Sequence, residues 1–340
     1  MTIDTGTLAT VREFDGPRMN GVPDAVASSS QPVILRDWVS HWPLVTAAKT
    51  SPRHVFEELA KYDRGAVVPV TVGSPAVRGR VFYNDDFTGF NVDRGNAAIG
   101  QVLRRILDHG DGPNPPLVYL ASADIDDVLP GLSAQNAVSF EAVEPLASIW
   151  IGTRTRIAAH NDLPRNLACV AAGRRRFILF PPEQVKNLYV GPFELTPAGR
   201  PISLVDFEAP DLNRFPRFED AWASGQVAEL GPGDALFIPS MWWHHVQALD
   251  AFNVLINYWW RTVPAHLGTP QDVLNHAIMT LRDMPDDERQ IWKMLFGHYI
   301  FDADETVADH IPEDARGSLA PISPDMARTM RDQLRQRLNR

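Results

Sequence analysis

The sequence predicts a mainly β protein with flanking helices, in which an antiparallel sandwich or barrel forms the core. Short runs of β-branched and aromatic residues, separated by Gly, Pro and Asp, follow one another from residue 117 to residue 262. On both sides of this segment, apolar residues instead recur at helical spacing. We therefore expect a mixed α/β region packing on the core at residues 1–116, the β core at residues 117–262, and a helical region at residues 263–340.

Composition and charge indicate a globular protein and limit its partners. The chain has 340 residues, of which 44% are hydrophobic and 22% charged. A formal net charge of −10 argues against nucleic acid as a partner, because nonspecific binding relies on Lys and Arg to neutralise phosphates. The single cysteine, Cys169, excludes an intrachain disulfide and a thiolate metal cluster. Neither a signal peptide nor a membrane-spanning run is recognisable, so we expect a cytoplasmic protein.

The N-terminal region combines a strand with two helices. Residues 32–35 form a short apolar run typical of a buried strand. Ser51 and Pro52 are the residues that cap and open a helix. Apolar residues at helical spacing predict a second helix over residues 99–107, which Gly110 ends.

Seven runs predict the strands of the core, and a turn signal at residues 231–234 separates two of them. The sequence there is Gly-Pro-Gly-Asp, which favours a tight reversal of the chain. The predicted strands are residues 117–121, 148–159, 166–172, 174–180, 235–239, 245–249 and 252–260.

The C-terminal region predicts helices opened by Thr269-Pro270 and Ser323-Pro324, with a further helix over residues 286–296. Their apolar stripes exceed what is needed to cover one end of a barrel. We expect a homodimer built on residues 269–300, with a smaller contribution from residues 323–338. The alternative is that these stripes simply pack onto the barrel.

A candidate metal site begins with His160-Asn161-Asp162 at the end of a strand-like run. Residues two apart on a strand share a face, so His160 and Asp162 can both point into a barrel. A third ligand is available from His244 or His245, of which only one can face the same way. Either pattern alone also occurs by chance. Together, two histidines and one carboxylate with open positions are typical of non-haem Fe(II) oxygenases.

The sequence resembles the Jumonji C (cupin-like) oxygenases, and among them the asparaginyl hydroxylase of hypoxia-inducible factor and its bacterial relatives. The match follows the order and approximate spacing of the family's motifs over residues 117–261, and the run after Gln31 resembles its opening strand. The resembling segments are residues 159–162, 166, 173–182, 205–207, 214–216, 231–234, 238–239, 242–245 and 257–259.

The resemblance implies a double-stranded β-helix (jelly-roll) core and an enzyme that uses Fe(II), 2-oxoglutarate and O₂. It implies that His160, Asp162 and His244 are the iron ligands and the catalytic centre. The family ligand directly follows a pair of aromatic residues, which favours His244 over His245.

The resemblance also implies cosubstrate contacts and shows a departure. Arg175 stands where the family has a lysine that binds the distal carboxylate of 2-oxoglutarate, and a guanidinium can bind that group in a bidentate manner. Tyr119 matches a tyrosine that binds the same carboxylate, and Asn166 and Asn257 match polar residues of the site. The family's carboxylate-binding threonine is replaced by Ile157.

The expected reaction couples oxidative decarboxylation of 2-oxoglutarate to C–H hydroxylation of an unidentified protein or small-molecule substrate. The substrate-gripping pair of the asparaginyl hydroxylase would fall near Pro201-Ile202, where only Arg200 is available. The alternative is a non-catalytic cupin-like protein that binds a metal or a ligand, which Arg175 and Ile157 favour. A cupin that uses Mn or Zn is less well supported, because such cupins employ more histidine ligands.

Overall fold

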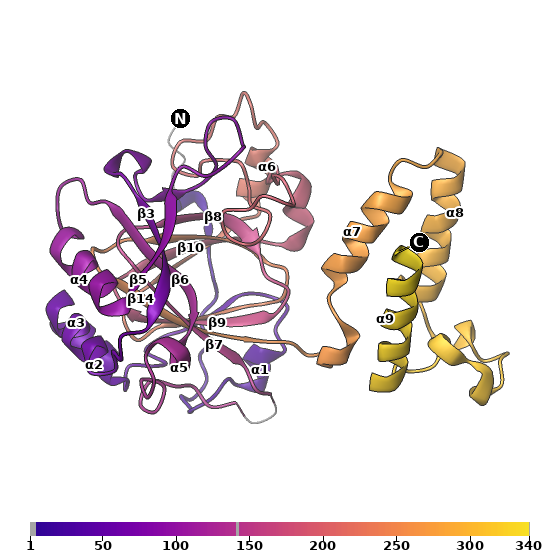
Figure 1. The fold of residues 1–340 in the computed structure, drawn as a ribbon, viewed down its shortest axis with the longest axis horizontal. Helices are drawn as coiled ribbons and strands as arrows, with labels where there is room; N and C mark the ends of the chain where they lie inside the picture. Colours follow the sequence, from indigo (N-terminus) through magenta and orange to yellow (C-terminus); the bar gives the residue numbers. More distant parts are fainter. Residues whose placement is uncertain (1–4, 141–142, 340) are drawn as a thin grey trace. The chain divides into compact units, whose positions relative to one another are not determined.

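The computed structural model describes residues 5–140 and 143–339. By their contacts these residues divide into two compact units, Met1–Trp260 and Arg261–Arg340. The first unit contains the β core and its helices, and the second is helical (Figure 1). The outer limits of the predicted regions, residues 1 and 340, lie outside the described residues.

Two sheets form the core of the first unit. One has six strands in the order β1-β11-β10-β13-β8-β4, and the other has eight in the order β2-β12-β9-β14-β7-β6-β3-β5. Neighbouring strands are antiparallel except for the pairs β1–β11 and β4–β8. The strands of the described residues are β1 (Ala9–Thr10), β2 (Val33–Leu35), β3 (Val67–Gly73), β4 (Arg80–Val81), β5 (Asp93–Ala98), β6 (Leu117–Asp124), β7 (Leu146–Gly152), β8 (Arg156–Asn161), β9 (Arg165–Ala172), β10 (Arg175–Phe180), β11 (Gln226–Leu230), β12 (Ala235–Ile238), β13 (Trp243–Ala248) and β14 (Asn253–Trp260).

Apolar side chains from both sheets pack into one buried cluster. Phe177 and Leu179 of the six-stranded sheet lie in it together with Val170, Leu236 and Leu255 of the eight-stranded sheet. The predicted mainly β fold, with a jelly-roll core and flanking helices, is therefore confirmed.

The single strand predicted over residues 148–159 is wrong, because it is two strands, β7 and β8. Thr153 lies buried at the corner between them. Its hydroxyl accepts from the Val118 amide at 3.1 Å and donates to the Pro116 carbonyl at 3.1 Å. A β-branched residue, of the type that favours a strand in the sequence, thus stabilises the turn between two strands. Strands β1, β3, β4, β5 and β11 are additional to those that the sequence predicted.

The helices begin where the sequence places their caps. The Ser51, Thr269 and Ser323 hydroxyls accept from backbone amides of the first turns of α3, α7 and α9. Among the described residues, no helix is both long and apolar enough to span a membrane. The α-helices of this part of the chain are α1 (Asp24–Ala27), α2 (Pro43–Thr50), α3 (Pro52–Ala60), α4 (Ile99–His109), α5 (Ile125–Val128), α6 (Phe218–Ala223), α7 (Pro270–Leu281), α8 (Asp286–Phe296) and α9 (Pro324–Leu338).

Helices α2, α3 and α4 lie together against the eight-stranded sheet (Figure 1). Leu44, Leu59 and Leu103, one from each helix, are fully buried in a cluster that includes Cys169 and Ile256 of strands β9 and β14. Apolar burial of this kind contributes about 1.5–3 kcal/mol for each large side chain. The helices therefore cover the outer face of this sheet and leave its other face to the cavity described below.

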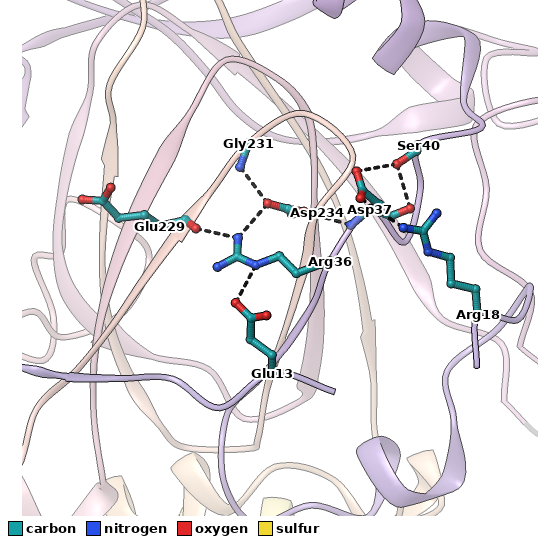
Figure 2. A network of polar contacts seen from close by, with 8 residues as sticks. All are labelled: Glu13, Arg18, Arg36, Asp37, Ser40, Glu229, Gly231 and Asp234. Atoms are coloured by element: carbon teal, nitrogen blue, oxygen red, sulfur yellow. Dashed lines mark hydrogen bonds and ion pairs between the residues drawn. The ribbon is translucent and has the colours of Figure 1, made fainter. Parts of the chain in front are cut away.

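A polar network holds the N-terminal segment against the turn between β11 and β12 (Figure 2). The Arg36 guanidinium donates to Asp234 at 2.8 Å and to Glu13 at 2.8 Å. The Asp234 carboxylate also accepts from the backbone amides of Gly231 at 3.0 Å and Asp37 at 2.9 Å. Since its side chain is only 14% exposed, Asp234 satisfies groups that water reaches poorly and fixes the start of β12.

We expect Asp234→Ala to lower the free energy of unfolding by about 1–3 kcal/mol, because it leaves the Arg36 charge and two amides without their shared acceptor. Arg18→Ala is the matched control, since its ion pair with Asp37 has side chains that are 62% and 55% exposed. Exposed pairs contribute less than about 1 kcal/mol. Urea unfolding measures both changes, and equal losses in the two variants would contradict this role for the network.

The helical unit leaves many large apolar side chains exposed. Helices α7 and α8, both described over their whole length, contain no buried side chain. Apolar surface of this extent is normally covered by another surface. The exposed apolar residues of the two helices are Val273, Leu274, Met279, Ile291, Trp292 and Met294.

We propose that a second copy of the chain covers these residues, because homodimer interfaces are the most apolar of protein interfaces. The protein should be a dimer by light scattering, and Ile291→Glu with Met294→Glu should convert it to a monomer. Val185→Glu, at an exposed apolar residue of the first unit, should leave the dimer intact. A parent protein that is monomeric at micromolar concentration would end the proposal.

Candidate metal centre

The three predicted ligands meet at the end of strands β8 and β13. His160 and His244 lie directly opposite each other across the two strands, with ring centroids 4.4 Å apart. Asp162 follows β8, and its backbone carbonyl accepts from the Met241 amide at 2.8 Å. One donor atom from each of the three side chains lies within 4.8 Å of the others. A single ion can therefore contact all three.

Backbone carbonyls orient both imidazoles. His160 Nδ1 lies 2.9 Å from the Ala158 carbonyl oxygen, and His244 Nδ1 lies 3.0 Å from that of Trp242. A carbonyl oxygen can only accept, so each Nδ1 donates and each Nε2 keeps its lone pair. This support, which holds the ring and fixes its tautomer, is common behind metal-binding histidines. The His244 Nε2 lies 3.6 Å from the Asp162 carboxylate.

The charge state of the site suits a divalent cation. Burial, and then the neighbouring His160, lower the pKa of His244 to about 4, so this imidazole is neutral at pH 7. A neutral imidazole is the form that binds a metal. Two imidazoles and one carboxylate make up a donor set that suits Fe(II) and leaves further coordination positions free. The residues present therefore fit such an ion.

His245 faces away from this site. Its ring lies 4.7 Å from that of Phe207, in a different part of the core. Burial, and then the Arg156 charge, lower the pKa of His245 to about 3. Adjacent strand residues point to opposite faces, and the structure accordingly brings His244, and not His245, to the other two ligands.

A cavity of about 500 Å³ lies between the two sheets and contains the triad. This volume is within the range of small-molecule sites. All seven residues that the sequence selected line it, from strands of both sheets. They are Tyr119, His160, Asp162, Asn166, Arg175, His244 and Asn257.

Arg175 carries a buried charge in this cavity. Its side chain belongs to a residue that is 3% exposed, and its Nε has no hydrogen-bond partner in the described part of the chain. Burial lowers the pKa of Arg175 to about 10, so it stays charged at pH 7. Its neighbours differ, because Arg174 pairs with Asp250 at 2.9 Å and Arg176 with Glu229 at 2.7 Å. Of the three consecutive arginines, the middle one therefore faces the interior.

A tryptophan that the sequence did not select holds the polar residues of the opposite wall. The Trp150 indole donates to Asn257 at 2.7 Å, and the Asn257 amide donates to Asn166 at 3.3 Å. The Trp150 ring also stacks on Tyr119, with centroids 6.2 Å apart. Burial raises the pKa of Tyr119, which keeps its hydroxyl protonated and able to donate. The alternation of side chains along β7 is a signal that could have placed Trp150 on the inner face of the sheet. Its hydrogen-bond and ring partners could not be predicted, because they come from strands that are distant in the sequence.

Three further lining residues bear on what the cavity can bind. Ile157 lines it, so an apolar side chain stands where the family has a threonine. Arg200 lies in the wall as well, and so does Arg94 of strand β5. Arg94 was not selected from the sequence, because the segment Asp93–Ala98 carries no apolar alternation that would indicate a strand.

The comparisons with known proteins agree with this architecture. The family described as "Cupin-like domain" matches residues 20–266. Lysine-specific demethylase 8 of Xenopus tropicalis is 28% identical over 253 residues, which cover 72% of this chain and 51% of the relative. HSPB1-associated protein 1 of Rattus norvegicus is 34% identical over 148 residues, covering 41% of this chain and 29% of the relative. tRNA wybutosine-synthesizing protein 5 of Gallus gallus is 29% identical over 148 residues, covering 39% of this chain and 43% of the relative.

These matches span about half, or less, of the length of each relative. The family match covers more than half of this chain, and it includes the three candidate metal ligands, the residues of the cavity wall and strands β2 to β14. The chain therefore belongs to the family of proteins with a cupin-like domain.

Proposed function

We propose that the chain is an Fe(II)- and 2-oxoglutarate-dependent oxygenase that hydroxylates a C–H bond of its substrate. The observation that carries the proposal is the buried Arg175, which forms no ion pair with a carboxylate of the described residues and lines the same cavity as His160, Asp162 and His244. The triad alone fits many metal-binding proteins. A buried guanidinium beside it calls for an anion as a second ligand, because an uncompensated buried charge is costly.

His160, Asp162 and His244 would hold the metal. The two imidazoles are already oriented by backbone carbonyls, so binding requires little reorganisation. Fe(II), when bound, supplies the centre at which 2-oxoglutarate and O₂ react. Three protein ligands leave positions for both.

Arg175 and Tyr119 would hold the far end of the cosubstrate. Leu179 lies opposite His244 across strands β10 and β13, and Arg175 is four residues away on the same face of β10. That separation is roughly 13 Å between backbones, which an arginine side chain and a short dicarboxylate together can span. The guanidinium can take both carboxylate oxygens, and the Tyr119 hydroxyl can donate to one of them.

The cavity walls would orient the ligand and exclude water. Ile157, Phe177, Val246 and Leu255 give the cavity apolar walls. A charge-assisted hydrogen bond is stronger in such surroundings than in water. Trp150, by donating to Asn257, keeps the opposite wall rigid. The chain's contribution to the reaction is therefore the placement of ligands and the exclusion of solvent.

The names of the relatives point to different substrates, since one is named for lysine demethylation and another for tRNA wybutosine synthesis. We therefore argue the substrate class from the cavity of this chain. The alternative function is a non-catalytic cupin-like protein that binds a metal or a ligand, and the apolar Ile157 favours it by removing one cosubstrate donor. Succinate released from 2-oxoglutarate distinguishes the two, because only the oxygenase forms it.

The metal prediction uses the adjacent histidines as a matched pair. His160→Ala and His244→Ala should each abolish stoichiometric binding of Fe(II) or Mn(II), because each removes one of three ligands. His245→Ala should retain the metal, since that ring lies outside the cavity. Metal content after anaerobic gel filtration measures the effect, with circular dichroism to check folding. Loss of the metal in His245→Ala but not in His244→Ala would show that the assignment is wrong.

The cosubstrate prediction concerns Arg175. Arg175→Ala should raise the 2-oxoglutarate concentration for half-saturation by one to three orders of magnitude, because a charge-assisted contact in a partly dry cavity contributes roughly 2–4 kcal/mol. Calorimetry on the Mn(II)-loaded protein measures it. Arg174→Ala, whose side chain pairs with Asp250 outside the cavity, should bind as the parent does. Unchanged affinity in Arg175→Ala would assign the cosubstrate to another group.

A further inference from the structure

Two guanidiniums of the cavity wall, besides that of Arg175, lack carboxylate partners among the described residues. Arg94 and Arg200 both line the cavity, and neither forms an ion pair with any carboxylate of the described residues. Asp162 is the one acidic side chain among the residues of the cavity wall, and it belongs to the metal site. The charges of bound Fe(II) and of the 2-oxoglutarate dianion would cancel each other. The three arginines and one aspartate of the wall then give the cavity a net positive charge, although the whole chain has a net charge of −10.

Arg94 is held in position by groups that do not neutralise it. Its Nη2 donates to the Pro197 carbonyl at 2.6 Å, and its guanidinium carbon lies 4.4 Å from the centre of the Phe90 ring. Both contacts restrict the side chain and leave its other N–H groups free to donate. A pre-organised guanidinium of this kind is suited to bind an anion in a bidentate manner.

The strand register separates Arg94 from the cosubstrate position. Arg94 of β5 pairs with Thr71 of β3, and Thr71 pairs with Tyr119 of β6, so the three share one face in a row across the sheet. Two strand spacings place the backbone of Arg94 roughly 10 Å from that of Tyr119. Arg94 thus marks a second anion position toward the edge of the sheet, distinct from the one at Arg175.

One loop joins this second position to the metal strand. The loop that carries Pro197 and Arg200 is tied to β8 where the Ser203 amide donates to the Ala159 carbonyl at 2.7 Å, next to His160. Its Pro197 carbonyl receives the Arg94 guanidinium. The loop that carries Arg200 therefore connects the strand of His160 with the Arg94 guanidinium.

A further donor of the cavity wall lies next to Trp150, whose ring is 5.8 Å from that of Trp259. Trp259 lines the cavity, and its indole Nε1 is buried without an acceptor in the described part of the chain. A buried donor of this kind is normally satisfied. The cavity wall thus offers two guanidiniums and, elsewhere, one buried indole N–H, each of which calls for an acceptor oxygen.

We infer that the substrate is a small molecule with an anionic group, a carboxylate or a phosphate, that binds Arg94 and Arg200 while its reacting C–H faces the metal. This inference rests on the proposed function and narrows its substrate class. A cation such as a lysine side chain is disfavoured, because it would meet two like charges. The limited cavity volume, of about 500 Å³, favours a small molecule over a folded macromolecule.

A charge series on one carbon chain tests the inference. The full chain is saturated with Mn(II) and 2-oxoglutarate without O₂ and titrated separately with pentanoate, pentyl phosphate, pentanamide and pentylamine. Tryptophan fluorescence measures binding, since Trp150 and Trp259 line the cavity. The two anions should bind at least about tenfold more tightly than the amide, and the amine should not bind. The tighter binder of pentanoate and pentyl phosphate shows whether the anionic group of the substrate is a carboxylate or a phosphate.

Variants locate the preference. Arg200→Gln should lower the affinity for the better anion about tenfold and leave that for pentanamide and for 2-oxoglutarate unchanged, and Arg200→Lys should restore most of the loss. Arg94→Gln should have the same effect, and Arg174→Gln, outside the cavity, should have none. A parent protein that binds 2-oxoglutarate but shows no preference for the anions, or binds none of them, overturns the inference.

Failure of the proposed function looks different. In that case 2-oxoglutarate does not bind the Mn(II)-loaded protein at all. The same titrations can then be made on the Mn(II)-loaded parent protein and on its Arg94→Gln and Arg200→Gln variants. Weaker binding of the anions to the variants would still show that Arg94 and Arg200 form an anion site.

Discussion

The Arg175 charge inside the β core is the constraint on which the rest of the site depends. A guanidinium that is 3% exposed and has no carboxylate partner among the described residues is stable only where an anion or water can reach it. The core therefore keeps a cavity between its two sheets instead of closing it with side chains. The same opening gives a ligand held by Arg175 access to His160, Asp162 and His244.

Strand register converts this constraint into a site. Strand β13 lies between β8 and β10, so it places His244 opposite His160 on one side and opposite Leu179 on the other. Alternation along β10 then brings Arg175 to the same face as His244. Alternation along β13 turns His245 away from the cavity and against Phe207. A shift of one residue in the pairing of β13 would exchange the two histidines and separate His244 from His160 and Asp162. The packing of His245 against Phe207 therefore helps to fix the register that forms the triad.

Local signals in the sequence were sufficient for helices α3, α4, α7, α8 and α9, for most strands and for seven residues of the cavity wall, but not for helices α1, α2, α5 and α6. Ser51 and Thr269 cap helices through contacts within a few residues, and His160 with Asp162 share one strand end. Features that depend on distant pairing were missed. Arg94 lies on a strand without apolar alternation and reaches the cavity only because β5 pairs with β3. Thr153 resembles a strand residue, yet its hydroxyl is used at a corner by Val118 and Pro116.

We propose two anion positions in this one cavity, at Arg175 and at Arg94 with Arg200, and the central claim concerns the position at Arg175. The most direct measurement is the crystal structure of the protein with Mn(II) and 2-oxoglutarate, grown without O₂, with the ion located by its anomalous scattering. The account predicts one ion bound by His160, Asp162 and His244, with the distal carboxylate of 2-oxoglutarate on Arg175. An ion bound elsewhere, or a cosubstrate that leaves Arg175 without a partner, would contradict it.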